Sequence, residues 1–271
     1  MKKSTLFLFA IMALFLTGCN SKKTDTIKDA AGLDGKVFGV ISPWVSTDVF
    51  ESAMANTTKP KAGEIIYYNR HSDIVAAMIA GKIDAAQVLK IVADYSAKRN
   101  EMLKIIQLDK KYQSSVVMAL RSEDKQLKAD IDSAITLLQT NGILKQLEDL
   151  WITNLPVENE PSNKEIPKIE GAKIIYIGVS GDVTPLDYIA ADGRPAGYNV
   201  ALLTEIGKIL NVNFEFVSIE TQAKITALSS KKIDVIFCHM VDDEIPTFFG
   251  DEYIMTRSYF TDEEVCFLVR K

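Results

Sequence analysis

The feature that most constrains the fold is a repeated unit, found once in each half of the chain. The first copy ends in Ile74–Val88 (IVAAMIAGKIDAAQV) and the second in Ile225–Cys238 (ITALSSKKIDVIFC). Each copy combines an amphipathic helical stretch, a Lys-Ile-Asp turn and a short apolar strand. A chain that repeats such a unit is expected to form two similar bodies.

The repeat extends upstream of these segments in both halves. In each half a β-branched strand is followed by a helical stretch and then by a second strand. The expected elements are strands Lys36–Ile41 and Glu64–Tyr68 around helix Asp48–Asn56, and strands Lys173–Ser180 and Asn213–Ile219 around helix Asn199–Leu210. Strands that alternate with helices at this spacing predict parallel sheets flanked by helices. The sequence therefore predicts an α/β fold with two lobes, each of β-α-β-α-β order.

The segment between the two units adds a strand, two helices and a linker. Ser115–Leu120 is apolar and β-branched, whereas Asp124–Gln139 and Ile143–Trp151 show helical periodicity and are separated by Asn-Gly. Residues 155–172 contain three prolines and several charges, and they lack periodicity. We expect them to form a linker.

The N-terminus has the pattern of an exported lipoprotein. Two lysines precede an apolar run, Leu6–Leu16, that is too short to span a bilayer comfortably, and the run ends in Leu-Thr-Gly-Cys. This ending resembles the bacterial lipobox. We expect residues 1–18 to be a signal peptide, Cys19 to be lipidated and residues 19–32 to be a tether. The alternatives are an uncleaved membrane anchor or a chance cysteine after a signal.

Charge argues against nucleic acid as a partner. The chain carries 31 basic and 36 acidic residues, and removal of residues 1–18 leaves 29 against 36, a net charge of −7. The remaining chain of about 250 residues is long enough for two lobes.

Two cysteines, Cys238 and Cys266, remain after Cys19. Export permits a disulfide between them, and two buried thiols are an alternative with at least as much support. The two histidines lie far apart in sequence, and no Cys/His cluster has the spacing of metal ligands, so we expect neither a metal site nor a cofactor.

Short motifs are found in both halves of the chain. In the second half they are Ile177–Val179, Thr184–Leu186, Asp192–Gly193, Gly197–Leu203, Lys231–Ile236 and Tyr259–Lys271. In the first half they are Leu33–Lys36, Gly39–Val40, Ala80–Ala85, Arg121–Asp124 and Asn141–Trp151. These segments resemble parts of a type II periplasmic solute-binding protein of the amino-acid-binding kind (bacterial extracellular solute-binding family 3). Each motif is weak alone, and their joint order is specific.

The order of these motifs implies a circular permutation of the family's chain. The family's first segment corresponds to residues 173–271, which come last here. The resemblance implies one lobe of residues 33–120 with 265–271, and another of residues 121–264 that includes the linker. It places the hinge near Leu120–Ser122 and Asp262–Glu264. The alternative is a fragment of two incomplete tandem domains.

The resemblance also implies a ligand cleft between the lobes, where polar residues follow the strands. The candidate ligand-binding residues at these strand ends are Trp44, Ser46, Thr47, Arg70, Ser180, Asp182, Thr221 and His239. Trp44 would offer an apolar platform. Each has a structural alternative: Trp44 can pack under its loop, Ser46 and Thr47 can cap a helix, Asp182 can stabilise a turn, and His239 can be a satisfied loop residue.

Two positions depart from the amino-acid-binding members. The family carries an arginine clamp for the α-carboxylate shortly after the strand matching Val235–Cys238, whereas Val241–Pro246 (VDDEIP) has three acids and no cation. The family's aspartate for the α-amino group is replaced by Leu89. An ordinary α-amino acid, held in the usual way, is therefore not expected.

The resemblance implies an extracytoplasmic solute-binding lipoprotein that passes a small molecule to an ABC permease. Its expected place is the cell envelope of a bacterium, lipid-anchored on the periplasmic or outer side of a membrane, as a monomer. The alternative is a sensing, scaffolding or degenerate binding module without a transport role. An enzyme is least favoured, because the chain shows no Ser/His/Asp arrangement, nucleophile elbow or strand-end pair of acids.

Overall fold

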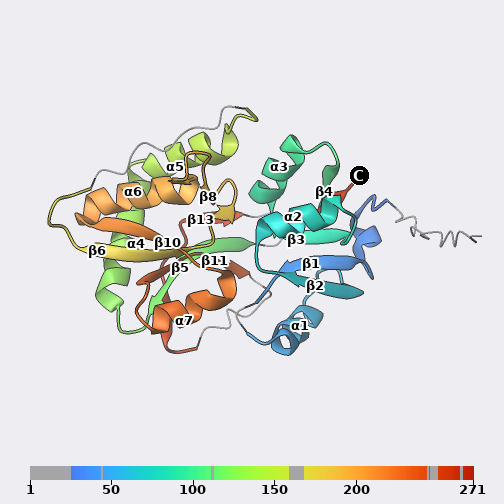
Figure 1. The fold of residues 1–271 in the computed structure, drawn as a ribbon, viewed down its shortest axis with the longest axis horizontal. Helices are drawn as coiled ribbons and strands as arrows, with labels where there is room; N and C mark the ends of the chain where they lie inside the picture. Colours follow the sequence, from blue (N-terminus) through green and yellow to red (C-terminus); the bar gives the residue numbers. More distant parts are fainter. Residues whose placement is uncertain are drawn as a thin grey trace, which may run out of the picture.

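Two α/β lobes lie side by side, and each is built around its own sheet (Figure 1). The structure is a computed structural model that describes residues 26–43, 45–110, 113–158, 168–242, 244, 250–262 and 265–271. The predicted two-lobed α/β fold is confirmed. No helix in these described parts is long and apolar enough to cross a membrane.

The first lobe, here called lobe A, has a five-stranded sheet. The strand order is β2 (Glu64–Tyr68), β1 (Val37–Ile41), β3 (Ala85–Leu89), β14 (Val265–Arg270) and β4 (Leu103–Gln107). β1 is parallel to β2 and β3, whereas β14 is antiparallel to both of its neighbours. Helices α2 (His71–Ile79) and α3 (Lys90–Arg99) pack their apolar sides on one face, and α1 (Thr47–Ala55) follows β1.

The second lobe, lobe B, has an equivalent sheet. Its order is β10 (Asn213–Ser218), β6 (Ile174–Val179), β11 (Val235–Asp242), β5 (Ser114–Arg121) and β12 (Tyr253–Met255), with β13 (Phe260–Asp262) also paired to β5. Apolar side chains of α4 (Lys125–Thr140), α5 (Ile143–Glu148) and α6 (Tyr198–Leu210) cover one face, and α7 (Lys224–Ser229) covers the other. A small sheet of β7 (Asp182–Val183), β8 (Asp187–Ile189) and β9 (Pro195–Ala196) follows β6.

Each sheet is completed by a strand that arrives from the other lobe. β5 follows β4 of lobe A but pairs with β11 and β12 in lobe B. β14 follows β13 of lobe B but lies between β3 and β4 in lobe A. In both sheets this arriving strand is antiparallel to its neighbours, so the two lobes are equivalent in topology.

The predicted hinge near Leu120–Ser122 is wrong. Because β5 is hydrogen-bonded within lobe B along Ser114–Arg121, the chain must cross between the lobes before Ser114. Lobe A therefore ends near residue 110 instead of residue 120. The other crossing falls between Asp262 and Val265, where the sequence places it.

The N-terminal segment is part of lobe A from residue 26 onwards, which corrects the predicted tether of residues 19–32. Ile27 is 5% exposed and Leu33 is fully buried. Both pack with Phe38, Ile106 and Phe267 on the sheet face opposite α2 and α3. Between them, the Asp29 carboxylate accepts a hydrogen bond from the Gly32 N–H at 3.1 Å and caps a short 3₁₀ helix, Ala30–Leu33.

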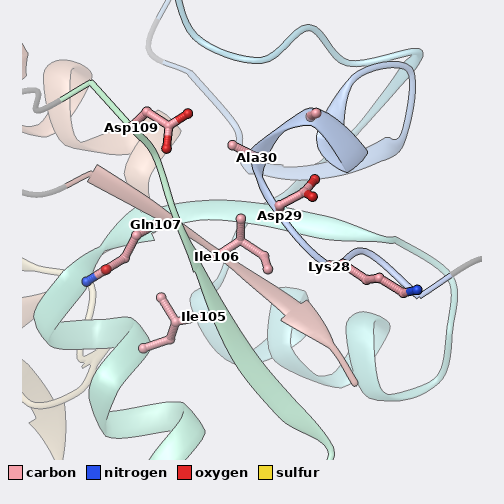
Figure 2. A pocket seen from close by; sticks show the side chains of 8 residues that line it. Lys28, Asp29, Ala30, Ile105, Ile106, Gln107 and Asp109 are labelled. Carbon is pink, nitrogen blue, oxygen red and sulfur yellow. The ribbon is translucent and has the colours of Figure 1, made fainter.

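A hollow of about 460 Å³ lies along the seam between this segment and β4. Figure 2 shows Lys28, Asp29 and Ala30 on one side of it and Ile105–Gln107 on the other. β4 is the last strand of its sheet on this side. In the described part of the chain, no further strand pairs with its outer edge.

Packing of Ile27 predicts that the N-terminal segment stabilises lobe A. We expect Ile27→Ala to lower the free energy of unfolding by roughly 2 to 4 kcal/mol, because it leaves a cavity in the core. The matched control Ile189→Ala changes a residue that is 47% exposed, and should cost less than about 0.5 kcal/mol. Urea unfolding of the two variants measures the difference. Equal losses would show that the segment is not packed on the sheet.

Candidate functional site

Two polar segments meet at the boundary between the lobes. In lobe B, β6 ends at Val179 and leads through Ser180 and Gly181 into Asp182, the first residue of β7. In lobe A, β2 ends at Tyr68 and leads into the N-terminus of α2, which contacts β7. The carboxyl ends of strands from both sheets therefore supply this region, which is where ligands bind in open α/β sheets.

Asp182 joins lobe B to lobe A. Its side chain is 7% exposed, and its Oδ2 lies 3.6 Å from Nε of Arg70. The same oxygen accepts a long hydrogen bond, 3.4 Å, from the backbone N–H of Ser72 in the first turn of α2. The first N–H groups of a helix have no partner within the helix, and its N-terminus favours negative charge. The carboxylate is thus held by a cation and by a helix terminus.

A buried lysine lies behind Ser180. Lys224, the first residue of α7, is 3% exposed, and its ammonium donates a hydrogen bond to Oγ of Ser180 at 2.8 Å. Burial raises the pKa of Asp187, and the positive charge of Lys224 opposes that rise. A buried charge is tolerated when an opposite charge lies near it. The charge of Lys224 therefore acts on the buried Asp187 carboxyl, whose pKa stays raised.

Glycine conformations place Asp187 in this cluster. Gly181 has φ +72° and donates its N–H to Oδ1 of Asp187 at 2.8 Å. Gly197 has φ +111°, and a Cβ there would lie 2.4 Å from the carbonyl oxygen of Leu186. This close approach brings the start of α6 against Asp187, so that the Asn199 amide donates to its Oδ2 at 3.4 Å.

His71 opens α2 of lobe A and is under the influence of two charges of lobe B, Asp182 and Lys224. Burial lowers the pKa of His71, the carboxylate of Asp182 acts against this, and the ammonium of Lys224 adds to it. The net direction is downward, so the imidazole is neutral at pH 7 and keeps one donor and one acceptor.

The cluster can bind a polar molecule from both sides. It offers the ammonium of Lys224, the guanidinium of Arg70, the imidazole of His71 and the carboxylate of Asp182 across a boundary that opens if the lobes separate. Among the described residues, no group of three His, Cys, Asp or Glu side chains is arranged to hold a metal ion. The chemistry of the cluster is hydrogen bonding and charge pairing.

Of the predicted ligand-binding residues, the structure brings together Arg70, Ser180 and Asp182. Three of the others, Thr221, Ser46 and Thr47, are described outside this group. Thr221 starts a 3₁₀ turn, Thr221–Ala223, directly before α7 and Lys224. Ser46 and Thr47 are exposed at the start of α1, where Ser46 occupies the cap position without a side-chain capping bond.

Three further predictions fall wholly or partly outside what the structure describes. Trp44 and Cys19 are outside the described residues. The backbone of His239 lies in β11 opposite Val117, and its side chain is not described. Their roles remain predictions. The side chain of Cys238 is likewise not described. Cys266 is buried in β14, where its thiol lies 3.8 Å from the Val88 carbonyl oxygen.

Sequence reasoning missed four members of the cluster: His71, Asp187, Asn199 and Lys224. His71 follows β2, so its position after a strand was a usable signal. No such signal exists in the sequence for Lys224, because this residue begins an amphipathic stretch in which a lysine normally faces solvent. Its burial arises because α7 starts beside the end of β6, where Ser180 accepts its hydrogen bond.

A family model matches the part of the chain that carries this cluster. Residues 175–245 match the bacterial extracellular solute-binding proteins, family 3. This range runs from β6 to the residues after β11 and includes Ser180, Asp182, Asp187 and Lys224. The resemblance read from the sequence is confirmed over this range. A comparison with curated proteins gives no match.

Solved structures resemble the chain at low identity. They include a ligand-binding component of an ABC-type import system from Staphylococcus aureus with zinc bound (14% identity, TM-score 0.43, 86% of this chain and 65% of that one). Others are an ancestral arginine-binding protein bound to arginine (12%, 0.40, 88% and 86%) and the GluR0 ligand-binding core with L-glutamate (13%, 0.38, 88% and 85%). The chain spans less than two thirds of the first of these.

The class of fold follows from the strand order together with the family match. Two sheets of equivalent order, each with one antiparallel strand from the opposite lobe, make this a type II periplasmic-binding-protein-like fold. The segment from β6 to β11 matches the family model of the bacterial extracellular solute-binding proteins, family 3.

The lowered pKa of His71 predicts a specific pH dependence of stability. As pH falls through the ordinary value of 6.5, the unfolded chain takes up a proton that the folded imidazole resists. The wild type should therefore lose stability relative to His71→Asn between about pH 8 and about pH 5.5. Thermal unfolding across this range measures it. Parallel curves for the two proteins would contradict the burial of His71.

Proposed function

We propose that the protein is an extracytoplasmic solute-binding lipoprotein that captures a small ligand between its lobes and delivers it to an ABC transporter. The observation that carries the proposal is the cluster at the lobe boundary, where Arg70 of lobe A faces Asp182 of lobe B. The family match over residues 175–245 supports the same function. Residues 1–19 support export and lipid anchoring.

Binding is favoured over catalysis by the direction of the hydrogen bond between Lys224 and Ser180. The ammonium of Lys224 donates to Oγ of Ser180 at 2.8 Å. An ammonium donates to a hydroxyl but cannot take its proton. Ser180 is therefore proposed to contact ligand without acting as a nucleophile.

The proposed ligand is small and lacks a free α-amino-acid group. Leu89, where the family has an acid, is 5% exposed at the end of β3. The charges available at the cleft come from other places, namely Arg70, Asp182 and Lys224, so their geometry differs from that of the amino-acid clamp. Trp44 is proposed as an apolar platform that supplements these polar contacts.

We also propose that the chain is a circular permutation of the family's order. The pairing of β14 with β3 and β4, and of β5 with β11 and β12, supports one protein in which each half completes the sheet of the other. Two incomplete tandem domains would not be expected to complete each other's sheets in this way.

A second candidate function is a sensing or scaffolding module that does not deliver solute. It is favoured by the direct contact between Asp182 and Arg70, which connects the lobes through the protein's own groups. A transport protein needs the lobes to respond to ligand, whereas a scaffold does not. Ligand binding without a change in lobe separation would favour this alternative.

Ligand binding is tested with a thermal-shift screen of uncharged metabolites, small carboxylates and the common amino acids, followed by calorimetry. A ligand at 100 times its Kd should stabilise the fold by about 2.7 kcal/mol. Asp182→Asn should weaken the best hit by at least about tenfold, because it removes a charge at the boundary.

The matched control is Asp192→Asn, which changes an exposed acid paired with Arg194, and it should leave affinity unchanged. Equal affinity of all three proteins would place the ligand elsewhere. Tight binding of an unmodified α-amino acid, insensitive to Trp44→Ala, would refute the proposed ligand class.

Lipid anchoring is tested by Cys19→Ser. The wild type should fractionate with membranes, and the variant should lose that partitioning because the thiol that carries the lipid is gone. Cys266→Ser, which changes a buried thiol within β14, is the control and should remain membrane-bound. Unchanged partitioning of Cys19→Ser would show that the lipobox interpretation is wrong.

A further inference from the structure

A second set of contacts between the lobes converges on Glu244, which follows β11 of lobe B. Its Oε2 accepts a hydrogen bond from the backbone N–H of Thr58 at 2.9 Å, and its Oε1 accepts one from the Thr58 hydroxyl at 2.7 Å. The ammonium of Lys110 contacts the same Oε1 and lies 3.0 Å from Oγ1 of Thr58. Thr58 and Lys110 both belong to lobe A.

The loop that carries Thr58 is fixed by its own hydrogen bonds. The ammonium of Lys61 donates to the carbonyl oxygens of Met54 at 3.1 Å and Ala55 at 3.0 Å, and also to that of Thr57. The Thr57 hydroxyl donates to the Met54 carbonyl at 2.9 Å. These bonds satisfy the C-terminal carbonyls of α1. The position of the Thr58 N–H is therefore set within lobe A, independently of Glu244.

The donors around Glu244 are those that bind a carboxylate. An N–H, a hydroxyl and an ammonium use both of its oxygens, and hydrogen bonds to an ionised group are the stronger kind. Although partial burial alone would raise the pKa of Glu244, its bonds with Lys110 and Thr58 lower it to about 2. The Glu244 side chain is 16% exposed and that of Lys110 is 54% exposed, so the site is open to solvent on one side.

This arrangement explains an acid at an unexpected place. Glu244 lies in Val241–Pro246, where the family resemblance implies a cation for a ligand carboxylate. Here the chain supplies the carboxylate itself, and the cation comes from Lys110 near the crossing between lobes.

We propose that Thr58 and Lys110 form a carboxylate-binding site on lobe A, and that Glu244 of lobe B fills this site as a built-in ligand that latches the lobes together. The site is selective for a carboxylate because its three donors match two acceptor oxygens and one negative charge. When the latch opens, the site becomes available to a small carboxylate from solution. The inference does not depend on the solute-binding role of the Asp182 cluster.

The latch is tested by the distance between the lobes in the full-length chain without added solute. Spin labels on ketone-bearing amino acids at Lys82 of lobe A and Gln139 of lobe B, both exposed, leave the native cysteines untouched. Glu244→Ala should shift the distance distribution towards separated lobes, with the closed-to-open ratio falling roughly tenfold. Glu244→Gln retains an acceptor for the Thr58 N–H and should shift it less.

Two further variants test whether the shift is specific to the contact between Glu244 and Lys110. Glu101→Ala, an exposed acid in lobe A at the opposite end of β4 from Lys110, should leave the distribution unchanged. Lys110→Met removes the cation from the other side of the contact and should reproduce part of the Glu244→Ala shift even if that variant folds poorly. If Glu244→Ala and Lys110→Met both retain the wild-type distribution, the latch is refuted.

The binding site itself is tested with acetate as the probe. In Glu244→Ala the vacated site should bind acetate, seen as a saturable shift of the Thr58 amide resonance in NMR. Wild type, in which Glu244 fills the site, should respond at least about tenfold more weakly, and the double variant Lys110→Met with Glu244→Ala should not respond. An acetate response of the same size in all three proteins, or none in Glu244→Ala, would overturn the assignment.

Discussion

The structure depends on two strands, one contributed by each lobe to the sheet of the other. β5 and β14 each leave one lobe and complete the sheet of the other, and each is hydrogen-bonded on both sides by its new neighbours. Neither sheet would be continuous without its arriving strand, because β4 and β12 attach only through it. The two lobes are therefore obliged to fold as one protein.

Charged groups collect at one part of the boundary, beside an apolar core that runs from one lobe into the other. One cluster of buried apolar side chains includes Met78 and Leu89 of lobe A together with Val116 and Tyr259 of lobe B. Asp182 meets Arg70 and the start of α2, and the charge of the buried Lys224 acts on the buried Asp187. Buried charges of this kind contribute little net stability but become costly when one partner is removed. A boundary built from them is poised for rearrangement when a polar molecule enters.

The fold was largely predictable from the sequence, and the site was predictable in part. The repeated β-α-β-α-β pattern identified β1, β2, β6, β10, α1 and α6 because their periodicities are local. The crossing before β5 was not predictable, since Ser115–Leu120 is equally apolar for either sheet and its hydrogen-bond partners decide its lobe. The burial of Ile27 was not predictable, because this residue lies in a polar segment. Lys224 was missed for the same physical reason: burial of a single side chain is set by distant segments, in this case the end of β6.

The acids after β11 show how a departure from a family pattern is resolved by long-range contacts. In the sequence alone, Glu244 indicates that the cationic clamp of the amino-acid-binding members is absent. In the structure it meets Thr58 and Lys110, which are 186 and 134 residues away in sequence. A clamp on a ligand makes closure conditional on that ligand, because the lobes are bridged only when it is present. A carboxylate carried by the chain makes the bridge available at all times. Because its pair with Lys110 is half-exposed, each ionic contribution is modest and reversible. The balance between open and closed lobes is thus set by the protein's own charges, and a solute shifts it by competing with them.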